Sequence, residues 1–447
     1  MKKLLLLLLC VPLIGLGQVY IPDANFKAYL VGEPLINTNG DSEIQVSEAT
    51  AFNGTIDCES MNISNLTGIE AFTTLENLQC GSNNLTSLDV TSNTSLIELW
   101  CSYNQLTSFD VSNNTNLTRL SCASNQLTTL DVSANTALMY LFCTENQLTT
   151  LDVSQNTALE NLECGSNNLT SLDVTSNTSL IELWCSYNQL TSFDVSNNTN
   201  LTRLSCASNQ LTTLDVSANT ALTTLFCYEN QLTNLDVSNN TSLQTLDVSA
   251  NQISSLDVSN NSLIESFACY GNLLNNLDVN HLYDLENLSC GGNLFNTLDV
   301  TNNFNLRILI CNYAFITSID LSYNFYLESL DVGGGIFTEL DLSENSNLVD
   351  LICAENPISY LNINNGNNSN ILRFWSLLCF NLTCIEVDDP LWSTNNWISS
   401  AQSYFWFEPQ HYFSDNCPPS AIQENTTNKE LLKITDILGR EVNEKRN

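Results

Sequence analysis

One 21-residue unit decides the fold of this chain: Leu75-Glu-Asn-Leu-Gln-Cys80-Gly-Ser-Asn83-Asn-Leu85-Thr-Ser-Leu88-Asp-Val90-Thr-Ser-Asn93-Thr-Ser95. Its halves, of 10 and 11 residues, both read Leu-x-x-Leu-x-(Cys or Val)-x-x-Asn, so each half predicts one short strand and one turn. The cysteine recurs every 21 residues after a first step of 22, and valine fills two gaps in phase. The resulting ladder is Cys58, Cys80, Cys101, Cys122, Cys143, Cys164, Cys185, Cys206, Cys227, Val248, Cys269, Cys290, Cys311, Val332 and Cys353.

A repeat this short cannot bury its apolar side chains alone and does so by stacking on its own copies. Leucine, cysteine and valine at alternate strand positions are expected to point inward. Asn83 and Asn93 are expected to turn the corners and to bond backbone groups that would otherwise be unpaired. Fifteen ladder positions at about 4.8 Å per coil predict a rod roughly 70 Å long. The predicted fold class is a mainly β solenoid of short parallel strands with N- and C-terminal caps.

The pattern resembles the leucine-rich repeats, specifically the nested 21-residue (IRREKO-like) class of secreted bacterial proteins, over about residues 55–365. The resemblance implies a leucine-rich-repeat array of stacked parallel strands. Residues 76–138 also recur as residues 160–222, 84 positions later, with Gln79 becoming Glu163 as the single difference. So recent a duplication implies that array length and surface periodicity matter more than any unique residue inside the array.

Composition excludes several classes of function. The chain has 447 residues, with 12 Lys and Arg against 48 Asp and Glu, and the net charge of −36 makes nucleic acid a poor partner. The two histidines, His281 and His411, lie far apart, which argues against a zinc site built on clustered histidines. No G-x-S-x-G, P-loop, H-E-x-x-H or glycine-rich nucleotide motif occurs. An acid repeated in every coil is not an acid tuned by one special pocket, so we expect no enzyme.

The chain divides into five predicted segments: a secretory signal peptide over residues 1–17, an N-terminal helical cap with an EF-hand-like loop over 18–53, the repeat solenoid over 54–366, an aromatic C-terminal cap over 367–417, and a linker with a partial sorting signal over 418–447. Two lysines precede an apolar run over residues 4–14, and small residues follow at Gly15 and Gly17, which is the order of a signal peptide. A lipid anchor at Cys10 is the disfavoured alternative, because bulky Leu9 precedes it.

The C-terminal tail carries a second resemblance. A strand-like stretch, Leu431 to Ile437, precedes Leu438-Gly-Arg-Glu, and residues 429–441 resemble the opening of the sorting signals of type IX secretion. The chain stops before the further strands that normally complete such a signal. The resemblance implies contact with a secretion machinery through the tail and a secreted or cell-surface location. The alternative is a disordered tail after the Pro418-Pro419 linker.

A candidate metal loop lies in the N-terminal cap. It fits the EF-hand calcium loop at most ligand positions, with oxygens at positions 1, 3 and 5 and a glutamate at position 12. The predicted ligands are Asn37, Asn39, Asp41, Glu43 and Glu48. Asn37 replaces the usual first aspartate, and Ser42 stands where glycine relieves the sharp turn. The alternative is an Asx-rich turn, so calcium is a candidate ligand and no cofactor is required.

The cysteines have three interpretations: inert core thiols, stacked disulfides or a metal chain. One cysteine per coil at an inward position, with valine as a substitute, favours inert packing. A disulfide is predicted outside the ladder, between Cys384 and Cys417, which flank the aromatic cap. That bond would close a loop of about 33 residues and contribute roughly 3 to 4 kcal/mol. Cys379 is the competing partner.

An aspartate recurs at an outward position in every coil, at 89, 110, 131, 152, 173, 194, 215, 236, 257, 278, 299, 320 and 341. Thirteen stacked carboxylates repel one another. The ladder must therefore be hydrogen-bonded and solvated, which we favour, or bridged by cations.

The residue before each ladder cysteine also points outward, and large aromatics occupy this position in alternate coils. Such side chains on an exposed sheet face can stack on a glycan or grip an extended peptide. The alternative is packing among themselves that stabilises the face, or an accident copied by duplication. The predicted ligand-binding residues are Trp100, Tyr103, Phe142, Trp184, Tyr187 and Phe226.

The sequence thus predicts a non-catalytic, secreted or cell-surface binding or adhesion protein that is a monomer and meets a protein or glycan through an exposed repeat face. The alternative is a structural spacer, or a cation-stabilised surface component without a specific ligand.

Overall fold

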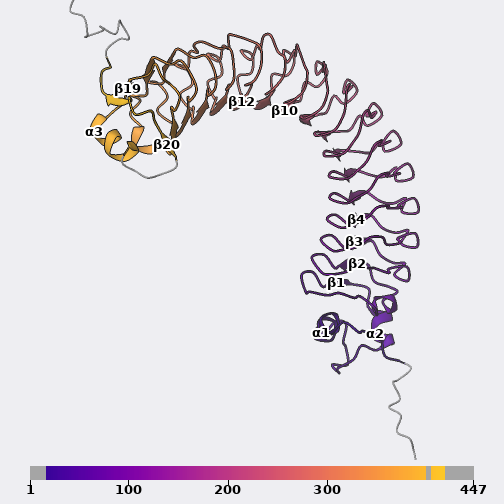
Figure 1. The fold of residues 1–447 in the computed structure, drawn as a ribbon. Coiled ribbons are helices and arrows are strands. Elements are labelled where there is room, and N and C mark those ends of the chain that lie inside the picture. Colours follow the sequence, from indigo (N-terminus) through magenta and orange to yellow (C-terminus); the bar gives the residue numbers. More distant parts are fainter. Residues whose placement is uncertain (1–16, 399–403, 418–447) are drawn as a thin grey trace, which may run out of the picture.

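The computed structural model describes residues 17–398 and 404–417, so the predicted sorting signal and nearly all of the predicted signal peptide lie outside the described residues. The stacked coils form a long solenoid that is bent into an arc rather than a straight rod (Figure 1). A 17-stranded parallel sheet runs along its inner side. Strand pairing keeps the 21-residue register, with Leu78 opposite Leu99 and Leu225 opposite Leu246. The predicted fold class is confirmed.

The strands of this sheet are short and follow one another coil by coil. They are β1 (Thr55–Asp57), β2 (Asn77–Gln79), β3 (Glu98–Trp100), β4 (Arg119–Ser121), β5 (Tyr140–Phe142), β6 (Asn161–Glu163), β7 (Glu182–Trp184), β8 (Arg203–Ser205), β9 (Thr224–Phe226), β10 (Thr245–Asp247), β11 (Ser266–Ala268), β12 (Asn287–Ser289), β13 (Ile308–Ile310), β14 (Ser329–Asp331), β16 (Asp350–Ile352), β18 (Arg373–Trp375) and β20 (Phe405–Trp406).

The core is a continuous stack of leucine, cysteine and valine side chains. The thirteen ladder cysteines are free thiols and fully buried, and Val248 and Val332 are equally buried in the same slot. Burial raises the pKa of the Cys164 thiol to about 12, so this thiol stays protonated. In the described residues the ladder thus consists of small packed side chains.

Two rows of asparagines hold consecutive coils together. In the first, Nδ2 of Asn104 donates to the carbonyl oxygens of Cys80 and Cys101 at 3.0 and 3.1 Å, and its Oδ1 accepts from Leu85 N. In the second, Nδ2 of Asn114 donates to the carbonyls of Val90 and Asn93. Each row repeats in nearly every coil and satisfies backbone groups at the turns, as the sequence predicts.

The second half of most repeats is not a strand, and this part of the prediction is wrong. Among the described residues, these halves pair only through an Asp89–Asp110 bridge and a four-stranded parallel sheet near the C-terminal end. That sheet consists of β15 (Glu339–Asp341), β17 (Tyr360–Asn362), β19 (Cys384–Glu386) and β21 (Tyr412–Ser414). The bend explains the difference, because coils spread apart on the outer side of the arc (Figure 1). Hydrogen bonding between strands requires them to lie about 4.8 Å apart.

The N-terminal end of the solenoid is covered by two short helices, α1 (Ala24–Gly32) and α2 (Val46–Ala51), and a 3₁₀ turn, η1 (Ile69–Ala71). Asp23 caps α1 by accepting from the backbone N–H groups of Asn25 and Phe26. Phe26 and Leu30 are fully buried against the first coils, so α1 closes the open end of the core.

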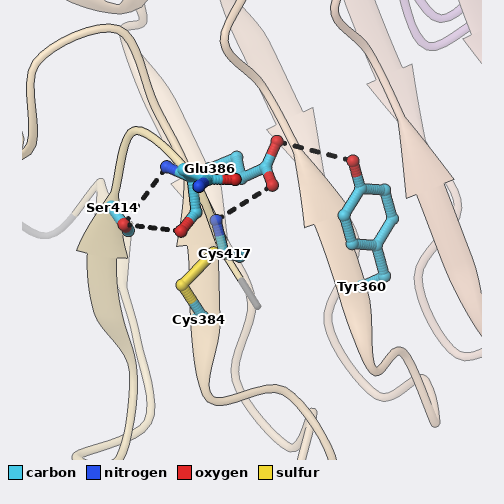
Figure 2. The surroundings of a disulfide bond; sticks show 6 residues. Tyr360, Cys384, Glu386, Ser414 and Cys417 are labelled. Carbon is cyan, nitrogen blue, oxygen red and sulfur yellow. Dashed lines mark hydrogen bonds between the residues drawn. A yellow bond between two sulfur atoms is a disulfide. The ribbon is translucent and has the colours of Figure 1, made fainter. Parts of the chain in front are cut away.

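At the C-terminal end both sheets continue into residues 367–417 through β18 to β21, with η2 (Asn368–Asn370) before β18 and with α3 (Pro390–Ser393) and η3 (Thr394–Ile398) between β19 and β20. Trp397 is buried among phenylalanines, including Phe374 at 5.6 Å between ring centroids. A disulfide joins Cys384 to Cys417, and Glu386 accepts from Cys417 N at 3.0 Å beside it (Figure 2). These contacts seal the last coil.

Candidate ligand-binding face

The aromatic row consists of Trp100, Phe142, Trp184 and Phe226, at the ends of β3, β5, β7 and β9. All four side chains are half-buried on the outward face of the long sheet. One strand separates the members of each pair, yet the rings meet across it: the centroids of Trp100 and Phe142 lie 6.3 Å apart, and those of Trp184 and Phe226 lie 6.5 Å apart. The structure thus groups the row into two ring pairs, each with its tryptophan inside one copy of the duplicated segment and its phenylalanine four residues beyond the end of that copy.

Polar contacts orient the tryptophans. Trp100 Nε1 donates to Glu98 Oε2 at 3.1 Å, and Trp184 Nε1 donates to Glu182 Oε2 at 3.3 Å. Arg203 pairs with Glu182 at 2.8 Å and holds this carboxylate in place. Each indole nitrogen is thus bound to a carboxylate on its own strand, and each tryptophan side chain stays half-buried.

Tyr103 and Tyr187 lie in the turns after β3 and β7, where both have φ of 57°. They are 63% and 54% exposed, so neither tyrosine is covered by the ring pairs. Tyr187 OH lies 3.2 Å from Tyr228 OH, two coils further on, whereas Thr144 occupies the position equivalent to Tyr228 in the first copy. The hydrogen bond with Tyr187, together with partial burial, raises the pKa of Tyr228 to about 12.

The second copy contains a surface hollow of about 590 Å³. Its aromatic lining residues are the ring pair Trp184 and Phe226 and the hydrogen-bonded pair Tyr187 and Tyr228. Its further lining residues are Thr144, Glu163, Gly165, Ser166, Ser186, Ser205 and Asp247. An open hollow with aromatic walls and a few polar groups is the kind of surface that binds a ligand.

Two acids border this hollow at its opposite ends. Glu163 on β6 lies next to Trp184, and Asp247 on β10 lies next to Phe226, in the same outward row of the sheet. Desolvation by burial raises the pKa of both carboxyls above their ordinary values. Neither acid belongs to any of the ion pairs of the described residues.

Sequence reasoning missed Glu163, Asp247 and Tyr228 as site residues. The two acids are members of the outward series that contains the aromatic row, so their positions were visible in the 21-residue register. Tyr228 lies six residues beyond the end of the duplicated segment, where the two copies cease to be identical. A comparison of the copies beyond position 222 would have found it.

The candidate calcium loop is arranged as a set of turns. Glu48 is buried, and its two oxygens accept from Asn39 N, Thr38 Oγ1 and Gln45 N. Burial opposes the charge of Glu48, but these hydrogen bonds outweigh it and lower its pKa.

The other loop residues face different partners. Glu43 pairs with Lys27 at 2.7 Å, Asp41 accepts from Glu43 N, Asn39 accepts from Asp41 N, and Asn37 Nδ2 donates to backbone carbonyls. Among the residues described, no three His, Cys, Asp or Glu side chains form a metal-ligating group. The structure does not bring the three predicted acidic ligands together, and these contacts favour the Asx-rich turn.

The aspartate ladder is hydrogen-bonded to its own turns. Asp89 Oδ1 accepts from Thr91 N at 3.1 Å and from Thr91 Oγ1 at 2.7 Å, and the equivalent Asp131 accepts from Ser133 N at 2.9 Å. The side-chain hydrogen bond from Thr91, with the backbone one, lowers the pKa of Asp89. The ladder therefore caps local N–H groups on the outer side of the coils.

Comparison with known proteins agrees with this architecture. A family model of leucine-rich repeats (two copies) matches residues 94–135 and 178–219. The functional domain of InlJ from Listeria monocytogenes, which includes a cysteine ladder, is 40% identical over 78% of each chain, with a TM-score of 0.74. A leucine-rich-repeat protein of Leptospira interrogans is 26% identical over 66% of this chain and 76% of its own, with a TM-score of 0.57.

YopM, a leucine-rich effector protein from Yersinia pestis, shares the fold at 20% identity, with a TM-score of 0.61 over 74% of this chain and 88% of its own. No match was found among curated proteins. None of these similarities points to an enzyme family, and no helix in residues 17–398 or 404–417 is long and apolar enough to span a membrane. The chain belongs to the leucine-rich-repeat proteins with 21-residue repeats and is similar to their internalin-type members.

Proposed function

We propose that this protein is a non-catalytic binding protein, secreted or held at the cell surface, that meets a protein or glycan through the aromatic row. The observation that carries the proposal is the hollow at Trp184 and Phe226, where large apolar rings stay half-exposed on the inner face of the arc. Leucine-rich-repeat folds are typical of protein-binding domains, and concave solenoid surfaces serve this purpose. The predicted signal peptide and the predicted contact of the tail with a secretion machinery support the location.

The ring pairs favour a binding face over a spacer. Their mutual contact supplies some sheet stability, but each pair leaves exposed ring area on a curved face. Aromatic anchors at the centre of an interface carry much of its binding energy.

The test uses the full chain on a glycan and peptide array, with the double variant Trp100→Ala/Trp184→Ala. The matched control is Phe304→Ala/Phe325→Ala, which removes two aromatics of 46% and 47% exposure outside the row. We expect the tryptophan variant to lose array binding by about tenfold or more while circular dichroism shows a folded chain, and the control to bind normally. Equal binding by both variants would favour the spacer.

A further inference from the structure

We propose that the hollow of the second copy is a receptor for an extended basic peptide, in which two Lys or Arg side chains about six positions apart pair with Glu163 and Asp247. This inference rests on the proposed function and names the class of ligand that this part of the face accepts.

The first step is the charge of the hollow. Its charged lining residues are Glu163 and Asp247, and both carboxyls are partly desolvated, which is what raises their pKa values. Arg203, the basic residue on the intervening strand β8, is already paired with Glu182. A partly buried carboxylate without a cation beside it gains more from a cationic ligand than a solvated one does. The net charge of −36 would further steer a basic ligand toward the chain.

The second step is the shape of the hollow between the two acids. The outward row across β6 to β10 reads Glu163, Trp184, Ser205, Phe226, Asp247. The rings of Trp184 and Phe226 meet across the strand that carries Ser205. The row therefore has an aromatic pair at its centre and one acid at each end. Rings of this kind bind the aliphatic stems of Lys and Arg and attract their charged ends.

The third step is the spacing. Four strand steps of about 4.8 Å separate Glu163 from Asp247, or roughly 19 Å. An extended peptide that crosses the strands advances about 3.3 Å per residue, so about six residues span this distance. Residues six positions apart also point to the same side of an extended chain, as do the two residues at alternate positions between them. Those intermediate side chains would lie on Trp184 and Phe226.

The duplication supplies an internal comparison. In the first copy the equivalent row is Gln79, Trp100, Ser121, Phe142, Glu163, so one of the two acids is a neutral amide. Thr144 stands where the second copy has Tyr228, and the tyrosine wall formed by Tyr187 and Tyr228 belongs to the second copy. The aromatic pair is the same in both copies. A peptide that binds the second copy more tightly than the first would therefore owe the difference to the acids and the tyrosine wall.

The experiment measures fluorescence anisotropy of a labelled peptide, Lys-Ser-Leu-Ser-Leu-Ser-Lys with neutral ends, against the full chain at low salt. Two further probes are compared: one in which Glu replaces both Lys, and Ser-Lys-Lys-Leu-Ser-Leu-Ser, which has the same composition and a different lysine spacing. We expect one peptide to bind per chain, with affinity that falls as salt rises. We expect the rearranged peptide to bind at least about threefold more weakly and the acidic peptide not to bind measurably.

The variants locate the site. Asp247→Asn and Glu163→Gln should each lower the affinity for the basic peptide by roughly tenfold, and Trp184→Ala should lower it by a similar factor. Matched controls are Asp331→Asn, a half-buried acid in the same outward row on β14, and Phe304→Ala, which removes an exposed aromatic outside the aromatic row. Both controls should bind the peptide normally. Two separate acid variants keep the test valid if one of them folds poorly.

The proposal is overturned if the acidic or the rearranged peptide binds as well as the basic one, or if both acid variants bind normally. If the basic peptide does not bind the full chain but Trp100→Ala/Trp184→Ala still loses array binding, the proposal of a basic-peptide receptor is wrong and the proposed function stands. Peptide binding that depends on Asp247 and Trp184, beside unchanged array binding of the double variant, would instead support the receptor and contradict the proposed use of the whole row.

Discussion

The hydroxyl oxygens of Tyr187 and Tyr228 lie 3.2 Å apart, although 41 residues separate them in the chain. One full coil lies between the two turns that carry them, so the hydrogen bond spans a coil on the rim of the second-copy hollow. Tyr187 holds a left-handed backbone conformation, with φ of 57°. The rim is thus tied together at the place where the two copies differ.

This hydrogen bond predicts a change of stability at alkaline pH. It raises the pKa of Tyr228 from an ordinary value of 10.0 to about 12 in the folded chain. The unfolded chain therefore loses this proton first, so the stabilisation is complete below about pH 10 and is lost as the pH rises toward about 12. Tyr228→Phe should flatten the fall of unfolding free energy with pH over this interval, measured by urea melts. Tyr103→Phe, at the first-copy position of Tyr187, is the matched control, and an equal effect of both variants would contradict the assignment.

The thiols predict a second result. Fourteen cysteines are free and buried in the described residues, so denaturation without reductant should expose about fourteen reactive thiols and the native chain should expose few. Cys164→Ala should lower the unfolding free energy by roughly 1 to 2 kcal/mol, because a small buried side chain is lost from a packed stack.

The matched control at this position is Cys164→Val, since valine occupies the same slot at Val248 and Val332 and is fully buried there. Cys164→Val should lower the unfolding free energy by less than Cys164→Ala does. Near-complete absence of free thiols in the denatured chain would show that the ladder is oxidised or metal-bound instead.

Glu48 predicts how the N-terminal cap responds to acid and to calcium. The hydrogen bonds from Gln45 N, Asn39 N and Thr38 outweigh burial and keep its folded pKa below the ordinary value of 4.5. The contribution of ionised Glu48 to the unfolding free energy is therefore present above pH 4.5 and is lost as the pH falls through the lower folded pKa. Glu48→Gln should lower the melting temperature near neutral pH by the same amount with calcium and with a chelator.

Asp41→Asn serves as the comparison, because it removes another predicted ligand without touching the buried carboxylate. If calcium raises the melting temperature of the wild type and both variants lose that increase, the loop binds calcium and the interpretation as a set of turns is wrong.

The sequence predicts most of the fold because a 21-residue period leaves little freedom. Inward positions, asparagine corners and the strand of the first half all follow from spacing such as that of Leu78, Cys80 and Asn83. Curvature does not follow from spacing, because it depends on how the inner and outer sides of the coils pack. For this reason the expected strand around Asp131 is replaced by a turn in which that side chain accepts from Ser133 N.

The candidate site was predicted in part for a related reason. Alternation along a strand places Trp184 on the outward face, but it does not show that this ring leans over Ser205 to meet Phe226. Contacts that skip a strand depend on side-chain rotamers, and the hollow bordered by Glu163 and Asp247 arises from them. Sequence alone identifies the row, and the structure shows where the row becomes a cavity.

The second asparagine row predicts a large loss of stability from one small change. Asn156 is fully buried, and its Nδ2 donates to the carbonyl oxygens of Val132 and Asn135, both at 2.9 Å, which ties two consecutive coils together. Asn156→Ala would remove both bonds at a cost of about 1 to 3 kcal/mol, while the two carbonyls keep their bonds from Asn135 N and Leu138 N. The neighbouring Gln155 is exposed, so Gln155→Ala should change the unfolding free energy by less than about 0.5 kcal/mol. Urea unfolding of both variants measures the difference directly. Similar small effects at the two positions would mean that the backbone of each coil is held by its parallel strands, and that the asparagines merely fill space at the corners.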